Sequence, residues 1–224
     1  MDNLFTKAFE NAPDDVKESI YKDFILNNNS DYCKELRMVY YKKVLKHMGE
    51  NVFIDKNVEI INPQWVSLGD NVKIHQGVTL IAKGEGGITI GNNSRLKERV
   101  LLDTENPKTG YINIANDVYV GTGTTFFGHE GLEIGEFTLI AQNVTCTPYS
   151  HIFENPDLFI YQQGGHSKKV TIGSDVYIGM GVNIMYSGDI GKGSVVGAGS
   201  VVVKPIPPYS VAVGNPAKVI KERK

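Results

Sequence analysis

The stretch "VTIGSDVYIGMGVNIMYSGDIGKGSVVGAGSVVV", residues 170–203, repeats a pattern of six residues. Each repeat carries a large aliphatic residue, often followed directly by glycine, and a small or β-branched residue four positions later. Side chains of a strand alternate between two faces, so a six-residue unit suits a short strand that turns at a small residue. An amphipathic α-helix would instead repeat its apolar residues every three or four positions.

The same spacing extends over most of the chain in groups of three aliphatic positions. The groups are Met48, Ile54 and Ile60; Leu68, Ile74 and Leu80; Ile90, Leu96 and Leu102; Ile114, Val120 and Phe126; Ile134, Ile140 and Cys146; Ile172, Ile178 and Ile184; and Ile190, Val196 and Val202. The steps that join one group to the next are 8, 10, 12, 8, 26 and 6 residues. Extra residues therefore enter only after every third repeat.

A coil with three flat faces explains these steps, because all insertions then lie at one corner of a triangular prism. The sequence predicts an all-β solenoid of about seven triangular coils, in which each coil buries its apolar face against its neighbours. Residues 49–204 would form the solenoid, and residues 147–169 would form an arm at the corner where insertions enter.

The two ends of the chain do not follow the repeat. We expect residues 1–48 to form an N-terminal helical cap, with Val16, Ile20 and Phe24 on one apolar face of a first helix. Ser30 is placed to cap a second helix that ends near Gly49. At the other end, prolines interrupt the repeat, and we expect residues 205–224 to form an extended segment followed by a short basic helix.

Composition excludes several classes of protein. The formal net charge of -2 gives no global basic signal for nucleic acid. There is no run of eighteen apolar residues and no signal-peptide pattern at Met1, so we expect no membrane span and a cytoplasmic protein. Cys33 and Cys146 lie far apart and do not show the spacing of metal ligands.

A family resemblance adds to this interpretation. Residues 170–221 closely resemble the C-terminal half of hexapeptide-repeat acyltransferases, most of all the galactoside, maltose and polysaccharide O-acetyltransferases. The run "VGAGSVVVKPIPP", followed by "GNPAKVI", is typical of the members that use acetyl-coenzyme A. The resemblance implies a left-handed parallel β-helix, acetyl-coenzyme A as co-substrate, no metal, and a homotrimer with active sites between subunits.

Within the predicted arm, "IAQNVTCTPYSHI" places His151 at the position that matches the family's catalytic histidine. Histidine as a residue type suits a general base that takes a proton from a sugar hydroxyl at cellular pH. His129, one coil below, and Tyr149 and His166 in the arm are further candidates for contact with the acceptor.

The resemblance also supplies an oxyanion donor and coenzyme contacts. It assigns the backbone N–H of Met180 to the oxyanion of the tetrahedral intermediate. From Lys204 onward there are five basic residues and one acidic residue, which suits an anionic nucleotide. The implied coenzyme contacts are Gly179, Met180, Ala198, Val203, Lys204, Lys218 and Lys221.

The leading hypothesis is an acetyl-coenzyme A-dependent O-acetyltransferase that modifies a sugar or a cell-surface polysaccharide. An N-acyltransferase acting on an amino sugar is the near alternative, because it uses the same fold, coenzyme and base. A γ-type carbonic anhydrase shares the β-helix but needs three histidines at one zinc ion, and His151 and His166 are fifteen residues apart. A non-catalytic scaffold solenoid is the remaining alternative.

Overall fold

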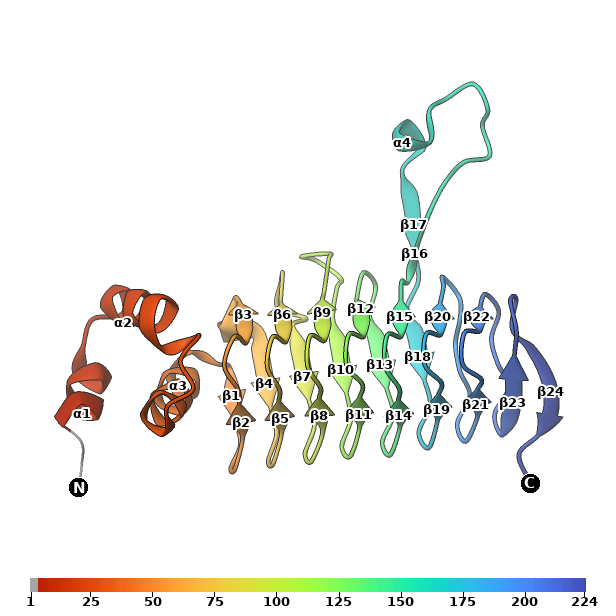
Figure 1. Cartoon of the computed structure of the whole chain (residues 1–224). Helices are drawn as coiled ribbons and strands as arrows, with labels where there is room; N and C mark the ends of the chain where they lie inside the picture. Colours follow the sequence, from red (N-terminus) through yellow and green to blue (C-terminus); the bar gives the residue numbers. More distant parts are fainter. Residues whose placement is uncertain (1–3) are drawn as a thin grey trace.

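The computed structural model describes residues 4–224, so the first three residues of the predicted cap 1–48 lie outside the described part. Helical segments lie at one end of a long stack of coils, and an arm projects from its side (Figure 1). The helical segments are α1 (Leu4–Asn11), α2 (Asp14–Ile20), the π-helical turn η1 (Tyr21–Ile25) and α3 (Asp31–Val44). Among residues 4–224, none of the helices has the length and apolar character needed to cross a membrane.

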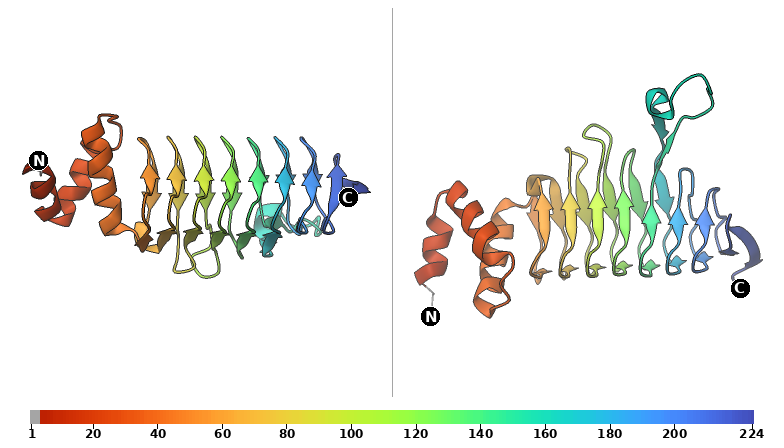
Figure 2. Two further views of the ribbon diagram at one scale, coloured as in Figure 1. Left: turned by 90° about the horizontal axis from the view of Figure 1, so that it is seen from below. Right: turned by 45° about the horizontal axis from the view of Figure 1, so that its top comes forward.

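The coils form a triangular prism with one parallel sheet along each face (Figure 2). Sheet A contains β1 (His47–Met48), β4 (Val66–Leu68), β7 (Ile88–Ile90), β10 (Ile112–Ile114), β13 (Leu132–Ile134) and β18 (Val170–Ile172). Sheet B contains β2 (Phe53–Ile54), β5 (Lys73–Ile74), β8 (Arg95–Leu96), β11 (Tyr119–Val120), β14 (Leu139–Ile140), β19 (Tyr177–Ile178), β21 (Val195–Val196), β23 (Ser210–Val213) and β24 (Lys218–Glu222). Sheet C contains β3 (Glu59–Ile61), β6 (Thr79–Ile81), β9 (Leu101–Asp103), β12 (Thr125–Phe127), β15 (Thr145–Cys146), β20 (Asn183–Ile184) and β22 (Val201–Val202). The left-handed parallel β-helix that the sequence predicted is confirmed.

The predicted aliphatic positions form continuous ladders inside the prism. In sheet B, Ile140 lies opposite Ile178, which lies opposite Val196 in the next coil. All three side chains are fully buried. Burying one aliphatic side chain of this size stabilises the folded state by about 1.5–3 kcal/mol, so the ladders provide the main driving force for folding. The spacing in the sequence thus predicted both the register and the buried face.

The corner between sheets A and B needs a residue in the left-handed conformation in every coil. Asn51, Asn71 and Asn93 occupy this position with φ of 55°, 58° and 60°, and asparagine adopts that conformation at low cost. The side-chain amide of each donates to the side-chain oxygen of the next residue along the ladder, which continues to Asp117. One coil later the same position holds Phe137, with φ of 59° and a side chain that is 62% exposed.

The first helical segments turn a different face inward from the one expected. The hydroxyl of Ser30 accepts a hydrogen bond from Cys33 N at 3.2 Å, so the predicted cap of α3 is confirmed. The predicted apolar face of α2 is wrong, because Val16 and Phe24 are exposed. The buried residues lie one position later, and Tyr21 among them stacks on Tyr40 of α3 at 4.1 Å between ring centroids.

Buried polar side chains fasten the cap to the first coil. The guanidinium of Arg37 is fully buried and donates from Nη1 to Ile25 O at 2.9 Å and to Asn28 O at 2.7 Å. The hydroxyl of Tyr41 donates to Val58 O in the first coil at 3.1 Å. A buried cation would be costly without these acceptors, so the path of the chain around Arg37 is closely defined.

The predicted C-terminal helix is wrong. Residues Lys218–Glu222 form strand β24, which runs antiparallel to β23. The last parallel strand offers an unpaired backbone edge, and the β-branched residues Val219 and Ile220 favour a strand at that edge. The prediction missed this pairing because the helical pattern was inferred from the tail alone.

Replacing Ile178 with Asp should unfold the protein, because the substitution places an unpaired carboxylate between Ile140 and Val196 at a cost of several kcal/mol. Asn183→Asp, at an exposed position of the same coil, is the matched control and should unfold at nearly the wild-type temperature. Circular dichroism during thermal unfolding measures both. A soluble Ile178→Asp variant that unfolds cooperatively would contradict the assigned register.

Candidate active site

Every insertion lies between a strand of sheet C and the next strand of sheet A, which confirms the predicted corner. The longest insertion is the arm. Its base is a two-stranded hairpin in which β16 (Tyr149–His151) pairs antiparallel with β17 (Gly165–Ser167). Its tip contains the single helical turn α4 (Ile160–Gln163) and extends away from the prism (Figure 1).

The hairpin holds His151 at the base of the arm. Its backbone lies opposite Gly165, and its side chain is exposed. The imidazole meets the ring of Tyr149 edge to face, with 5.0 Å between centroids and an interplanar angle of 86°. An exposed imidazole held by a neighbouring ring is accessible to a substrate and has limited freedom of rotation.

His129 reaches the same cluster from the coil below. It follows β12 and stacks on the ring of Tyr149, with 5.0 Å between centroids and an interplanar angle of 26°. Burial lowers the pKa of His129 from its usual value, and the carboxylates of Glu105 and Asp103 only partly oppose this shift. His129 Nδ1 is buried, and no hydrogen-bond partner for it is found within residues 4–224. The structure therefore joins His129, Tyr149 and His151 in one cluster.

His166 is not part of this cluster. It lies opposite Ser150 in the hairpin, and adjacent strand residues point to opposite faces, so it faces away from Tyr149 and His151. Its ring contacts Tyr186 instead, at 4.7 Å between centroids. In the part of the chain that the structure describes, no three His, Cys, Asp or Glu side chains are grouped to hold a metal ion.

Below the cluster lies an ion-paired group that the sequence analysis missed. Lys83 Nζ lies 3.1 Å from a carboxylate oxygen of Asp103 and 3.0 Å from one of Glu105. Burial opposes the charge of Lys83, but its hydrogen bonds to the two carboxylates raise its pKa overall. The available signal was positional, since all three residues follow closely after the third strand of a coil, where insertions enter.

The predicted oxyanion donor lies at the other edge of sheet C. Met180 occupies the corner between β19 and β20, and its side chain is 54% exposed. Its carbonyl accepts a hydrogen bond from Gly199 N at 2.8 Å, while its own N–H donates to no residue among those described. Gly179 N donates to Val196 O at 2.8 Å, and Ala198 is exposed in the next coil. These three residues form one continuous edge.

The remaining predicted coenzyme residues are exposed but scattered. Val203 and Lys204 follow β22 at the corner of the arm, whereas Lys218 and Lys221 lie on β24. One chain therefore does not bring the His151 imidazole to the Met180 N–H, because the full width of sheet C separates the two corners.

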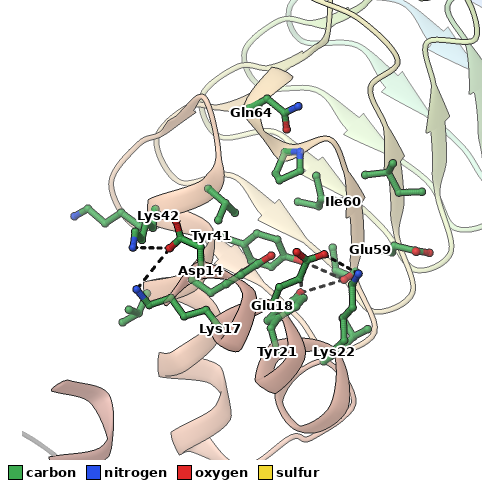
Figure 3. A pocket seen from close by; sticks show the side chains of 18 of the residues that line it. Asp14, Lys17, Glu18, Tyr21, Lys22, Tyr41, Lys42, Glu59, Ile60 and Gln64 are labelled. Carbon is green, nitrogen blue, oxygen red and sulfur yellow. Dashed lines mark hydrogen bonds and ion pairs between the residues drawn. The ribbon is translucent and has the colours of Figure 1, made fainter. Parts of the chain in front are cut away.

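A cavity of about 840 Å³ lies between the cap and the first coil, far from His151 (Figure 3). Several of its charged groups pair with each other, as Lys43 does with Asp14 at 2.9 Å and Lys22 with Glu18 at 2.7 Å. Unlike the histidine cluster, it presents no histidine or cysteine. We therefore assign it to the packing of the cap.

Comparison with known proteins supports the family resemblance. No family model matches the sequence. A Mycobacterium tuberculosis protein named "Probable acetyltransferase" is 32% identical over 168 residues, which cover 75% of this chain and 53% of that protein. The galactoside O-acetyltransferase of Escherichia coli is 39% identical over 113 residues, which cover 50% of this chain and 54% of the enzyme. The chain thus spans about half the length of the curated relatives it matches.

Among solved structures, the chain is similar to AntD, an N-acyltransferase from Bacillus cereus in complex with dTDP and 3-hydroxybutyryl-CoA. The TM-score is 0.56 at 24% sequence identity, and the match covers 85% of this chain and 87% of that one. At this identity the likeness establishes the fold. Together with the curated relatives, it confirms the resemblance to hexapeptide-repeat acyltransferases that the sequence indicated.

Replacing residues 153–163 with a short Gly-Ser linker should leave a folded coil. The coil is continuous without the arm tip, because β13 pairs with β18 and β15 pairs with β20. We expect the far-ultraviolet circular dichroism spectrum and cooperative unfolding to persist. Loss of the β-sheet signal in this variant would show that the arm belongs to the core.

Proposed function

We propose that this protein transfers an acetyl group from acetyl-coenzyme A to a hydroxyl group of a sugar or a cell-surface polysaccharide, in the cytoplasm. The observation that carries the proposal is its similarity to curated acetyltransferases, among them the galactoside O-acetyltransferase of Escherichia coli. An exposed histidine at the matching position supports the same chemistry.

In the proposed reaction His151 is the general base. Its imidazole takes the proton from the acceptor hydroxyl while the hydroxyl oxygen forms a bond to the thioester carbonyl carbon. The carbon–sulfur bond then breaks, and the proton on the imidazole passes to the departing thiolate. The thioester is already activated, so the enzyme needs no covalent intermediate.

The edge that contains Met180 is suited to the developing oxyanion and to the coenzyme. The Met180 N–H has no partner among the described residues, and a preorganised backbone donor stabilises negative charge that develops on the carbonyl oxygen. A Cβ atom built on Gly181 or Gly199 would meet no atom within 4 Å, so this edge is open to a ligand. Exposed Lys218 and Lys221 supply positive charge for phosphate groups.

A complete site in this proposal needs two chains. His151 and Met180 lie at opposite corners of sheet C, so the base of one subunit would face the oxyanion donor of its neighbour. The family resemblance implies a homotrimer, in which three such sites form between neighbouring prisms.

Exposed apolar surfaces support this assembly. Tyr119, Leu139 and Tyr177 lie side by side on the outer face of sheet B, and Phe137 adjoins them at the corner. The arm tip leaves the same level of the prism and carries its own exposed apolar side chains, including that of Tyr161, which is 95% exposed. Exposed patches of this kind mark interaction surfaces, and the two patches are chemically complementary.

Acylation of an amino sugar is the alternative that uses the same site. An amine attacks the thioester as a hydroxyl does, and its proton passes to the same base. An acceptor screen that measures thiol release from acetyl-coenzyme A, with sugars and amino sugars side by side, distinguishes the two reactions.

His151→Ala should lower turnover by roughly 10²–10⁴-fold, because removal of a general base withdraws that contribution from the transition state. Coenzyme A should still raise the unfolding temperature of the variant, since the proposed coenzyme contacts come from other residues. His47→Ala, an exposed histidine in the first coil, is the matched control and should retain wild-type turnover. Wild-type turnover in His151→Ala would refute the assignment and direct attention to His129.

Phe137→Asn should weaken the trimer without weakening the fold. Asparagine suits the left-handed conformation and occupies the same corner position in three earlier coils, while the substitution removes the exposed ring. Sedimentation equilibrium should give three times the 24.7 kDa chain mass for the wild type and a concentration-dependent lower mass for the variant. Asp117→Asn, at the same corner position, is the control. A monomeric wild type would refute the assembly.

A further inference from the structure

We propose that Tyr149 is a positioning residue, seated over Gly165, that fixes the imidazole of His151 and joins the arm to the coil through His129. This inference rests on the proposed role of His151 as the base. It assigns Tyr149 and His129 a task other than contact with the acceptor.

The ring of Tyr149 contacts both histidines of the cluster. It stacks on His129 at 5.0 Å and meets His151 edge to face at the same centroid distance. Both contacts are made by the aromatic ring of Tyr149. An aromatic ring held on two sides restricts the rotation of each neighbour.

Gly165 is required for this arrangement because it leaves space. A Cβ atom on Gly165 would lie 2.0 Å from the Tyr149 hydroxyl oxygen and 2.2 Å from Cζ, so the tyrosine ring lies directly across the glycine. At the adjacent Gly164 the backbone conformation requires glycine, because φ is 74°. Space is not the reason there, since an added Cβ would meet no atom within 4 Å. The two neighbouring glycines therefore serve different purposes, one for backbone conformation and the other for the ring.

Few other contacts tie the base of the arm to the coil. The hydroxyl of Ser167 donates to a Glu130 carboxylate oxygen at 3.0 Å, and that carboxylate also accepts from the Thr109 hydroxyl. These bonds and the contact between the rings of His166 and Tyr186 fix β17, whereas Tyr149 connects β16 to the coil by stacking on His129. Without its ring, the strand that carries His151 would lose this contact with the coil.

The surroundings of His129 hold its ring in place for stacking with Tyr149. Its ring is held between Tyr149 and the edge of Phe127, 6.2 Å away between centroids, and its Nδ1 is buried. Burial lowers the pKa of His129, which favours the neutral form of the stacked imidazole. The two histidines therefore differ in task, because His151 is exposed and His129 is half-buried.

Steady-state kinetics of variants test whether Tyr149 positions His151 for the reaction. Tyr149→Ala should lower kcat by about 10–100-fold with little change in the KM for acetyl-coenzyme A, because a displaced base loses near-attack geometry. Tyr149→Phe should retain kcat within about threefold, since the ring contacts remain. Gly165→Ala should lower kcat as Tyr149→Ala does, and part of its effect should disappear in the Tyr149→Ala background, because the clashing ring is gone while the contact of the added Cβ with Ser150 O at 2.7 Å remains. Ser150→Ala, on the opposite face of the same strand, is the matched control.

Nuclear magnetic resonance of the five histidine rings, assigned with single His→Gln variants, tests the geometry without relying on activity. Tyr149→Ala should shift the ring signals of His129 and His151 and leave His47 and His75 unchanged, whereas Tyr149→Phe should preserve all four. Unchanged signals in Tyr149→Ala, or additive losses from Gly165→Ala and Tyr149→Ala, would overturn the inference.

The outcomes separate this inference from the proposed function. An inactive His151→Ala with a fully active Tyr149→Ala refutes the positioning role alone. An active His151→Ala refutes the proposed base, while the histidine spectra still report whether Tyr149 holds both rings.

Discussion

Backbone hydrogen bonds between successive coils are the constraint on which the rest of the molecule depends. A strand of two or three residues has no stability of its own, so each is held by the coils on either side. Strand β20 illustrates this, because Thr145 N in the preceding coil donates to Val182 O at 2.9 Å and Asn183 N donates to Ser200 O in the next at 2.9 Å. A shift of one residue would turn Ile178 outward, so the pairing and the buried ladder enforce each other.

This coupling also explains why the two halves of the proposed site lie on different edges. Corners between sheets B and C are four-residue turns in every coil, and in the last two coils they carry small residues, Gly179 and Gly181 in one and Ala198 and Gly199 in the other. Corners between sheets C and A receive the insertions, and long side chains such as the imidazoles accumulate at that edge. In this part of the solenoid the Met180 backbone donor and the His151 side chain therefore lie at different corners, and the proposed site requires two chains.

The sequence predicted the ladder positions because the six-residue period is local and each coil repeats it. The corner of the insertions followed from the same count, and Ser30 was recognisable as a cap from its neighbours alone. The inward face of α2 was missed because contact with Tyr40 selects it. Two features were missed because only the three-dimensional register reveals them. The Lys83–Asp103 ion pair joins residues in different coils, and the packing of Tyr149 on Gly165 joins the two strands of the arm hairpin.

The reversal of direction at β24 has a consequence for solubility. A parallel solenoid exposes a bare strand edge at its end, which is a template for adding further chains and growing fibres. Here the antiparallel strand covers the end of sheet B, and it carries Lys218 and Lys221 along its outer length. The helical cap covers the opposite end of the stack (Figure 1). A charged edge at one end of the stack and helices at the other both oppose end-to-end polymerisation of the coils.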